Sequence, residues 1–261
     1  MVDYDITVFA TFDAWISLIT LSVLEIILGV DNIIFISIVA SKLPKPDQPR
    51  ARFIGLSLAL IIRVILLLFI GWIIGLTKPL FSLPIENIFN SLGIKNAAEA
   101  AAISGRDLIL ILGGFFLLAK STLEIHSKVY GEGHERTAKP KSAFGAVIFQ
   151  IALIDFVFSF DSVLTAVGLT DHIMVMIFAV VISMIVMMLF SAKISTFIEK
   201  YPTLQILALS FLIMIGFTLV IEGFDVHISK AFVYVAVAFS LTVEALNIRF
   251  RKRLESSKRI A

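Results

Sequence analysis

Long apolar runs constrain the fold of this chain more than any other feature. A helix needs about 20 mostly apolar residues to cross a bilayer core of about 30 Å. Seven runs of this kind occur in the 261 residues. They predict transmembrane helices at residues 14–40, 53–76, 107–127, 143–169, 172–192, 203–222 and 230–248. We therefore expect an all-α polytopic membrane protein in which residues 1–261 form a single membrane domain.

The composition supports this class and excludes several others. Hydrophobic residues make up 59% of the chain and charged residues 16%, whereas charged residues are about a quarter of an ordinary soluble domain. The absence of cysteine excludes disulfides, thiolate metal sites and thiol catalysis. A net charge of +2 gives no reason to expect a nucleic-acid partner. The first residues, MVDYDITVFATFD, lack the basic region and the cleavage site of a signal peptide.

Basic residues predict the orientation, because cytoplasmic loops are enriched in Lys and Arg. Most of them fall in alternate connections and in the tail, at residues 41–52, 128–142, 193–202 and 249–261. This distribution predicts an outside N-terminus, a cytoplasmic C-terminus and a basic cytoplasmic tail beside anionic lipid. The Ala-rich segment NAAEAAAIS, in the outer connection 77–106, predicts a short interfacial helix.

The order of the runs indicates two halves. Residues 14–127 and 143–222 each hold three runs, and a polar cytoplasmic linker at 128–142 joins them. Because three is odd, the second group enters the membrane with opposite polarity, which is the inverted-repeat plan of many secondary transporters. The expected architecture is a 3+3 inverted repeat followed by one C-terminal helix at 230–248.

Two matching segments place carboxylates inside these apolar runs, EIILGVDN at 25–32 and DFVFSFDS at 155–162. Each begins with a carboxylate, has an Asp six residues later, and has an Asn or Ser directly after that Asp. An Asp at the centre of a transmembrane helix costs about 2.5–3.5 kcal/mol. The four carboxylates are therefore candidates for function, because their excess negative charge calls for a divalent cation or for protons.

Two basic residues inside the runs are candidate counter-ions or coupling residues. Arg63 lies about ten residues into its run, which is deep enough to pair with the carboxylates. Lys120 lies nearer the cytoplasmic end of its run, where it can pair with Glu124 four residues later or extend to the interface. Even together, these two cations leave the four carboxylates in excess.

The spacing within the motifs leaves two geometries open. Residues seven apart return to within about 20° of the same helix face, so the first and last residues of each motif share a face. Residues six apart point about 120° apart in a regular helix. Either the carboxylates face different neighbours, or the helices break near Gly29 and Ser159 and turn both carboxylates inward. We favour the break.

The oxygen-rich motifs narrow the choice of ligand. Asp, Glu, Asn and Ser are hard donors that suit Mg²⁺, Ca²⁺ or Mn²⁺ and disfavour copper and structural zinc. The four histidines lie at run ends or in loops, so we expect no histidine-based zinc site in the motifs. The sequence contains no nucleotide-binding motif, so ATP is not expected to drive the protein.

These motifs resemble the TerC family of integral membrane proteins. The resemblance rests on LEIILGVDNIIFISI and DFVFSFDSVLTAVGL, and it extends to GGFFLLAKSTLEIH and HISKAFVYVAVAFSLTVEALN. It covers roughly residues 14–250. The family takes its name from tellurium resistance, is grouped with the LysE-type exporter superfamily, and includes manganese exporters and proteins that supply metal to exported enzymes.

The resemblance implies a transporter rather than an enzyme. It implies export of Mn²⁺ across the cell inner membrane by a multi-pass protein, with no cofactor beyond the transported ion. Proton antiport is our hypothesis for the coupling, because protonation of the carboxylates would release the metal. The partners that the resemblance allows are the metal ion, the lipid bilayer, a homo-oligomer and exported metalloenzymes that receive the metal. It implies that six residues line the metal site: Glu25, Asp31, Asn32, Asp155, Asp161 and Ser162.

Two other functions are alternatives. The same carboxylates would suit Ca²⁺, another divalent metal or a cationic amino acid. An intramembrane aspartyl protease is the remote alternative, because two Asp residues on different helices can share a proton as a catalytic dyad. That class carries Gly-x-Gly-Asp, whereas this chain has LGVD and FSFD.

Overall fold

The computed structural model describes residues 5–84, 86–91, 96–130, 140–167, 170, 172–226 and 228–258. Seven helices in these ranges are long and apolar enough to cross a membrane, which confirms the predicted fold class. They are α1 (Phe12–Ala40), α2 (Gln48–Leu68), α6 (Gly105–Tyr130), α7 (Pro140–Val167), α8 (Ile173–Lys200), α9 (Pro202–Glu222) and α10 (Lys230–Lys258). Residues 131–139, most of the predicted linker at 128–142, lie outside the described part.

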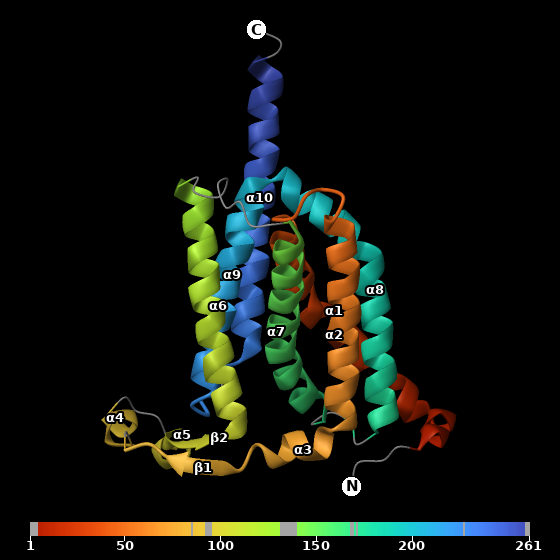
Figure 1. The fold of residues 1–261 in the computed structure, drawn as a ribbon, viewed down its shortest axis with the longest axis vertical. Helices are drawn as coiled ribbons and strands as arrows, with labels where there is room; N and C mark the ends of the chain where they lie inside the picture. Colours follow the sequence, from red (N-terminus) through yellow and green to blue (C-terminus); the bar gives the residue numbers. More distant parts are fainter. Residues whose placement is uncertain are drawn as a thin grey trace.

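The long helices alternate in direction along the chain (Figure 1). α1, α6, α8 and α10 start at the end of the bundle that holds the N-terminus, and α2, α7 and α9 return to it. The C-terminus lies at the opposite end, which also carries Lys42 and Lys45 of the α1–α2 connection and Lys200 at the end of α8. We call this the basic end, and the other the N-terminal end.

The second apolar run forms a shorter helix than predicted. α2 ends at Leu68, and Phe69 (φ −97°, ψ 24°) leaves the helical conformation before the short α3 (Ile70–Gly75) begins. α3 lies across the N-terminal end of the bundle (Figure 1). A single span over 53–76 is therefore wrong in its last part. The 21 residues of α2 already give a length of about 30 Å, which completes the crossing.

The segment between α3 and α6 also folds at the N-terminal end of the bundle (Figure 1). α5 (Ala97–Ala101) forms where the Ala-rich segment predicted a short helix, and α4 (Glu86–Ser91) precedes it. β1 (Pro79–Ser82) and β2 (Ala102–Ser104) pair antiparallel, which the sequence did not predict. β2 leads directly into α6.

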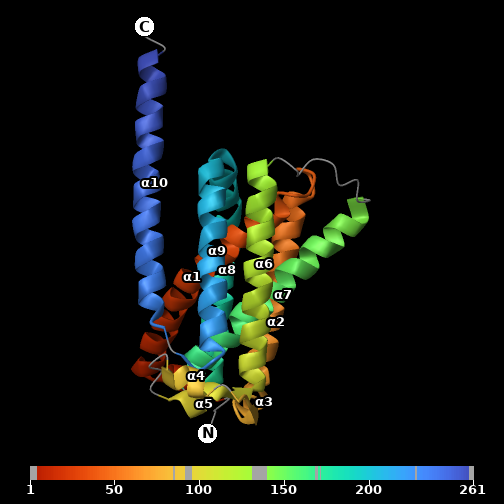
Figure 2. The same ribbon diagram turned by 90° about the vertical axis from the view of Figure 1, so that its left-hand side faces the viewer.

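The most extensive contacts between the long helices stay the same when the helices of the first half are exchanged with those of the second half. They join α6 with α9, α1 with α8 and α2 with α7. Exchanging α1 with α7, α2 with α8 and α6 with α9 leaves this set of contacts unchanged. α1 and α7 are inclined relative to the upright α6 and α9, and they run in opposite directions (Figure 2). A 3+3 inverted repeat requires such an arrangement, and the repeat itself stays a prediction.

Two glycines bring α6 and α9 into close contact. A Cβ at Gly114 would meet the Gly216 carbonyl oxygen at 2.6 Å, and a Cβ at Gly216 would meet the Gly114 carbonyl oxygen at 3.0 Å. The contact is therefore reciprocal, and it leaves no room for a side chain at Gly114 because a backbone carbonyl cannot rotate away. Small residues allow this approach between membrane helices, whose association depends on van der Waals packing.

α10 stands apart from the rest of the bundle (Figure 2). It packs mainly on α9, where the Thr203 hydroxyl donates a hydrogen bond to the Glu244 carboxylate. The C-terminal part of α10 projects beyond the basic end. Many of its large apolar side chains are exposed, as expected for a helix that faces lipid: Phe232, Val235, Phe239, Leu246 and Phe250.

We predict that Gly114→Ala destabilises the contact between α6 and α9. The added methyl group would lie 2.6 Å from a backbone oxygen. The two helices must then separate, and overpacking of this kind costs about 1–3 kcal/mol. Thermal unfolding of the purified protein in detergent should show a lower midpoint. Gly145→Ala is the control, because a Cβ there meets nothing within 4 Å; equal midpoints for the two variants would contradict the close contact.

Candidate functional site

Three buried charges meet where α1, α2 and α7 pack together. Arg63 of α2 forms an ion pair through Nη1 with Glu25 of α1, and its Nη2 lies 3.4 Å from Oδ1 of Asp155 on α7. Each of the three residues is only 3% exposed. A charge removed from water is tolerated when it is paired. The arginine therefore explains how both carboxylates are held inside the bundle.

Asp155 also accepts hydrogen bonds from uncharged side chains of both motifs. Asn32 Nδ2 donates to Asp155 Oδ1 at 3.4 Å, and Ser159 Oγ donates to Oδ2 at 3.0 Å. Ser162 Oγ donates in turn to the Ser159 carbonyl oxygen at 3.3 Å. Glu25 and Asn32 thus reach one cluster from one face of α1, as their spacing of seven predicts.

The predicted helix break is wrong. α1 and α7 are continuous α-helices through both motifs. Gly29, one residue assigned to a break, instead allows α1 to pack closely on α8, because a Cβ there would meet the Met187 sulfur at 2.3 Å. Ser159, the second residue assigned to a break, is fully buried. Its hydroxyl group donates a hydrogen bond to the carboxylate of Asp155, one turn earlier. Close packing and hydrogen bonding account for these two small residues.

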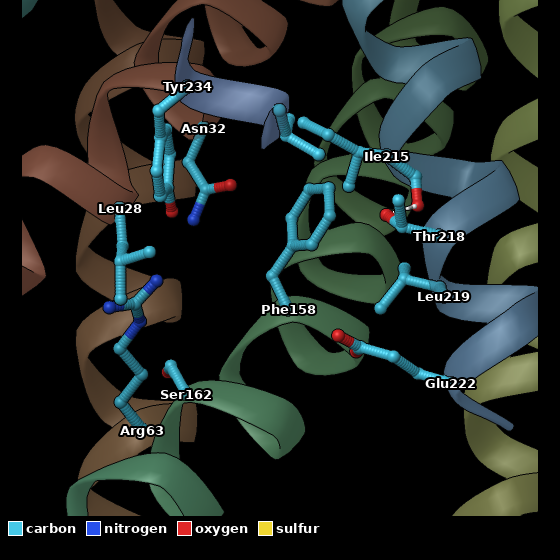
Figure 3. Close-up of a pocket in the computed structure, with 11 residues that line it drawn as sticks. Leu28, Asn32, Arg63, Phe158, Ser162, Ile215, Thr218, Leu219, Glu222 and Tyr234 are labelled. Carbon is cyan, nitrogen blue, oxygen red and sulfur yellow. Dashed lines mark hydrogen bonds between the residues drawn. The ribbon is translucent and has the colours of Figure 1, made fainter. Parts of the chain in front are cut away.

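A cavity of about 80 Å³ lies beside the ion cluster (Figure 3). Such a volume has room for several water molecules or for a partly hydrated ion. The Arg63 and Ser162 side chains lie on one side of it, and the Glu222 side chain extends from the other. Five helices contribute its polar lining residues: Asn32 (α1), Arg63 (α2), Ser162 (α7), Thr218 and Glu222 (α9), and Tyr234 (α10).

The structure brings together four of the six predicted ligands, Glu25, Asn32, Asp155 and Ser162. Asp31 and Asp161 lie on the continuous helices α1 and α7, but their side chains lie outside the described part of the structure. Their role as ligands stays a prediction. Among the described residues, no group of three or more His, Asp or Glu side chains is placed to hold a metal ion.

Lys120 lies away from the Arg63 cluster. It lines a second cavity of about 10 Å³, together with Glu124 and Gln150. Glu124 forms an ion pair with Lys42 of the α1–α2 connection at the basic end. The counter-ion or coupling role expected for Lys120 therefore concerns a different part of the bundle from that of Arg63.

Sequence reasoning missed three oxygen-bearing residues of the main cavity, Thr218, Glu222 and Tyr234. Glu222 is the last residue of α9, and a carboxylate at the end of an apolar run is expected to be solvated. Thr218 lies four residues earlier, on the same face of the helix. Hydropathy alone therefore gives no reason to assign any of the three to a site.

A repeated pattern does single out Glu222. Gly-Phe-x-Leu occurs at 114–117 in α6 and again at 216–219 in α9. A charged residue follows each pattern at the same distance, Lys120 in α6 and Glu222 in α9. The glycines that begin the two segments contact each other reciprocally. Glu222 thus has the same place in this sequence pattern as Lys120.

Sequence similarity to known proteins extends along nearly the whole chain, although no solved structure matches it. A family model described as "Integral membrane protein TerC family" matches residues 10–259. The UPF0053 protein of Haemophilus influenzae is 46% identical over 244 residues, which are 93% of this chain and 97% of that protein. The UPF0053 inner membrane protein YgdQ of Escherichia coli K12 is 46% identical over 241 residues, 92% of this chain and 95% of that protein. The UPF0053 inner membrane protein YoaE of the same organism is 46% identical over 234 residues, 89% of this chain but 42% of that longer protein.

We predict that Glu25 and Arg63 are energetically coupled. Glu25→Gln or Arg63→Gln alone leaves a buried charge with one partner fewer, so each should lower the free energy of unfolding. The double variant should cost less than the sum of the two, with a coupling energy of about 1–3 kcal/mol. Titration of the four proteins with SDS in mixed micelles measures the free energies.

The ion pair between Lys42 and Glu124 is the matched control, because the Lys42 side chain is 39% exposed. An ion pair in contact with water should show a coupling energy of at most about 1 kcal/mol. Strictly additive costs at Glu25 and Arg63 would contradict a buried pair that holds α1 to α2.

Proposed function

The chain belongs to the TerC family of integral membrane proteins, and we propose that it is a secondary transporter that exports divalent metal ions, Mn²⁺ first among them. The observation that carries this proposal is the cluster of Glu25, Arg63 and Asp155 inside the bundle, beside a polar cavity. Ionisable groups inside a membrane are costly and typically mark the path of an ion or a proton. Packing does not require them, because apolar side chains of similar volume stabilise a core at least as well.

The proposed metal ligands are the oxygen donors of the two motifs: Glu25, Asp31, Asn32, Asp155, Asp161 and Ser162. Carboxylate, amide and hydroxyl oxygens suit hard cations such as Mn²⁺, Ca²⁺ and Mg²⁺. The preference for Mn²⁺ comes from the family resemblance and not from the ligand type. Thr218, Glu222 and Tyr234 add oxygen donors around the cavity, where they would receive the ion as it leaves the motifs.

We propose that the motif helices belong to two inverted repeats, α1–α2–α6 and α7–α8–α9, followed by α10. The exchange symmetry of the helix contacts and the reciprocal glycine contact between α6 and α9 support this plan. The cavity supports it too, because residues at an offset of 130 line it in pairs, Leu28 with Phe158 and Asn32 with Ser162. Substrate sites of such transporters lie at the interface of the repeats.

Alternating access follows from this plan. A metal ion from the cytoplasm would exchange part of its water for the motif carboxylates, and rocking of one repeat against the other would expose it outward. Protonation of carboxylates would then release the ion, which couples export to proton entry. The described cavity includes Glu222 at the end of α9, so it extends toward the N-terminal end of the bundle, the outer end in the proposed orientation.

The relatives support a location in the inner membrane, since YgdQ and YoaE are named inner membrane proteins. We place this chain there as a multi-pass protein, in contact with the lipid bilayer and with its metal-ion substrate. A homo-oligomer and exported metalloenzymes that receive the metal stay predictions. Ca²⁺, another divalent metal and a cationic amino acid stay the alternative substrates.

We predict that Asp31→Asn and Asp161→Asn impair Mn²⁺ loading of inverted membrane vesicles that have an acidic interior. Each variant loses a proposed carboxylate ligand, and the loss of even an outer-shell partner of a metal site typically costs about 10–100-fold in affinity or activity. Glu222→Gln should also slow loading, because it removes a carboxylate that lines the cavity. Glu86→Gln, at an exposed position of α4, is the control and should load Mn²⁺ like the parent.

Loading by Asp31→Asn and Asp161→Asn at the parental rate would contradict the site assignment. Elemental analysis of cells with and without the protein tests the identity of the metal. Lower cellular manganese on expression supports export of Mn²⁺. Unchanged manganese with altered calcium or magnesium would instead make Ca²⁺ or Mg²⁺ the proposed substrate.

We predict that the N-terminal end of the bundle faces outward and the basic end faces the cytoplasm. The chain has no cysteine, so single cysteines can be introduced without background labelling. Both Ser82 and Lys45 are exposed. Ser82→Cys in β1 should react with a membrane-impermeant maleimide in spheroplasts, whereas Lys45→Cys should react only after permeabilisation. The opposite pattern would reverse the orientation and place the Glu222 side of the cavity toward the cytoplasm.

A further inference from the structure

Arg63 already forms ion pairs with two of the carboxylates that the proposed metal site requires. Its Nη1 pairs with Glu25 and its Nη2 lies 3.4 Å from Asp155 Oδ1, with all three residues buried. We propose that Arg63 is a tethered substitute for the metal ion: it is the counter-ion of Glu25 and Asp155 while the site is empty, and it moves away when the ion binds. This inference rests on the proposed function and concerns the same site.

A metal ion on these two carboxylates would stand close to the positive charge of the Arg63 guanidinium. A divalent cation binds carboxylate oxygens at about 2.0–2.6 Å, so it would stand close to a second positive charge. The arginine cannot avoid this repulsion by losing a proton, because a guanidinium stays protonated in proteins. This repulsion favours one cation at a time on the two carboxylates, so in our proposal metal binding displaces the arginine side chain.

The contacts of Arg63 allow such a movement. Its distance to Asp155 Oδ1 is at the long end of the hydrogen-bond range, and Asn32 Nδ2 lies equally far from the same oxygen. Arg63 Nε is buried without a hydrogen-bond partner among the described atoms. The side chain also lines the cavity, where the hydroxyl oxygens of Ser162 and Tyr234 can accept hydrogen bonds from a displaced guanidinium (Figure 3).

If the metal ion takes the place of Arg63 on these carboxylates, the protons in the transport cycle must be carried by other groups. With Arg63 in place, Glu25 and Asp155 have a counter-ion in the empty site and do not need protons for the return step. Metal binding then displaces an arginine from these two carboxylates, not protons. The exchanged protons are then carried by carboxylates other than Glu25 and Asp155.

Proton release on Mn²⁺ binding tests this inference. The purified protein in detergent is titrated with Mn²⁺ in weak buffer, and a pH indicator counts the protons released for each bound ion. Arg63→Met should release up to about two more protons per ion than the parent, because buried carboxylates without a counter-ion take up protons when the site is empty. Arg63→Lys should release fewer protons than Arg63→Met, because its ammonium group is a counter-ion for the carboxylates in the empty site.

Arg52→Met is the matched control. Arg52 lies about three turns earlier on the same face of α2, and its Nη1 donates to Ser195 Oγ at 3.0 Å, away from the cluster. This variant should keep the parental proton count. If Arg63→Met cannot be purified in folded form, the double variant Glu25→Gln/Arg63→Met removes one charge of each sign. It should release about one more proton per ion than the parent, from Asp155.

The outcomes separate this inference from the proposed function. A parental proton count in Arg63→Met, or an equal rise in Arg52→Met, would overturn the exchange of cations and leave metal export standing. A parent protein that binds no Mn²⁺ would instead overturn the proposed function, and the same titration with Ca²⁺ then tests the alternative substrate.

Discussion

A bilayer core provides no water for a charged side chain, so the protein must supply every partner itself. Arg63 is that partner for Glu25 and Asp155, and it thereby ties α2 to both motif helices. The contact between Gly114 and Gly216 brings two helices close through packing alone. The ion pairs also specify depth, because a shift of one helix by a single turn, about 5.4 Å, would leave buried charges without their partners.

The same constraint shapes what the cluster can do. An antiporter that exports a metal must return with the metal site empty, and an empty site of bare carboxylates would carry their whole charge through the bilayer core. Glu25, Arg63 and Asp155 together carry a single negative charge, so the resident cation removes most of that cost. The side chains that hold the helices in register are therefore the same side chains that would bind the ion. Glu25, Arg63 and Asp155 would therefore serve both the stability of the fold and the proposed binding of the ion.

The sequence predicts the seven crossings because the exposure of apolar side chains to lipid dominates the fold. It does not predict that α2 ends before its apolar run does, because an interface suits the same residues and hydropathy cannot separate the two environments. The spacing of polar residues correctly predicts that Glu25 and Asn32 reach one cluster. Helix continuity is missed because the effect of a glycine depends on its neighbour. Gly29 packs against Met187, more than 150 residues away along the chain, and no local pattern reveals that contact.

The two proposed repeats have different residues at matching positions, 29 and 159 in the motifs and 120 and 222 in α6 and α9. Ser159, which donates to a motif carboxylate, stands at the position where α1 has Gly29. Lys120 and Glu222 follow the shared Gly-Phe-x-Leu pattern with opposite charges, and they line separate cavities. Under the proposed orientation and mechanism, a carboxylate in the cavity that Glu222 lines would take up a proton from outside and help to release the ion, whereas a lysine is already protonated at neutral pH. Net export still depends on the ion and proton gradients. Under that proposal, the difference between the halves would give proton uptake a place at Glu222 that the corresponding position in α6 does not offer.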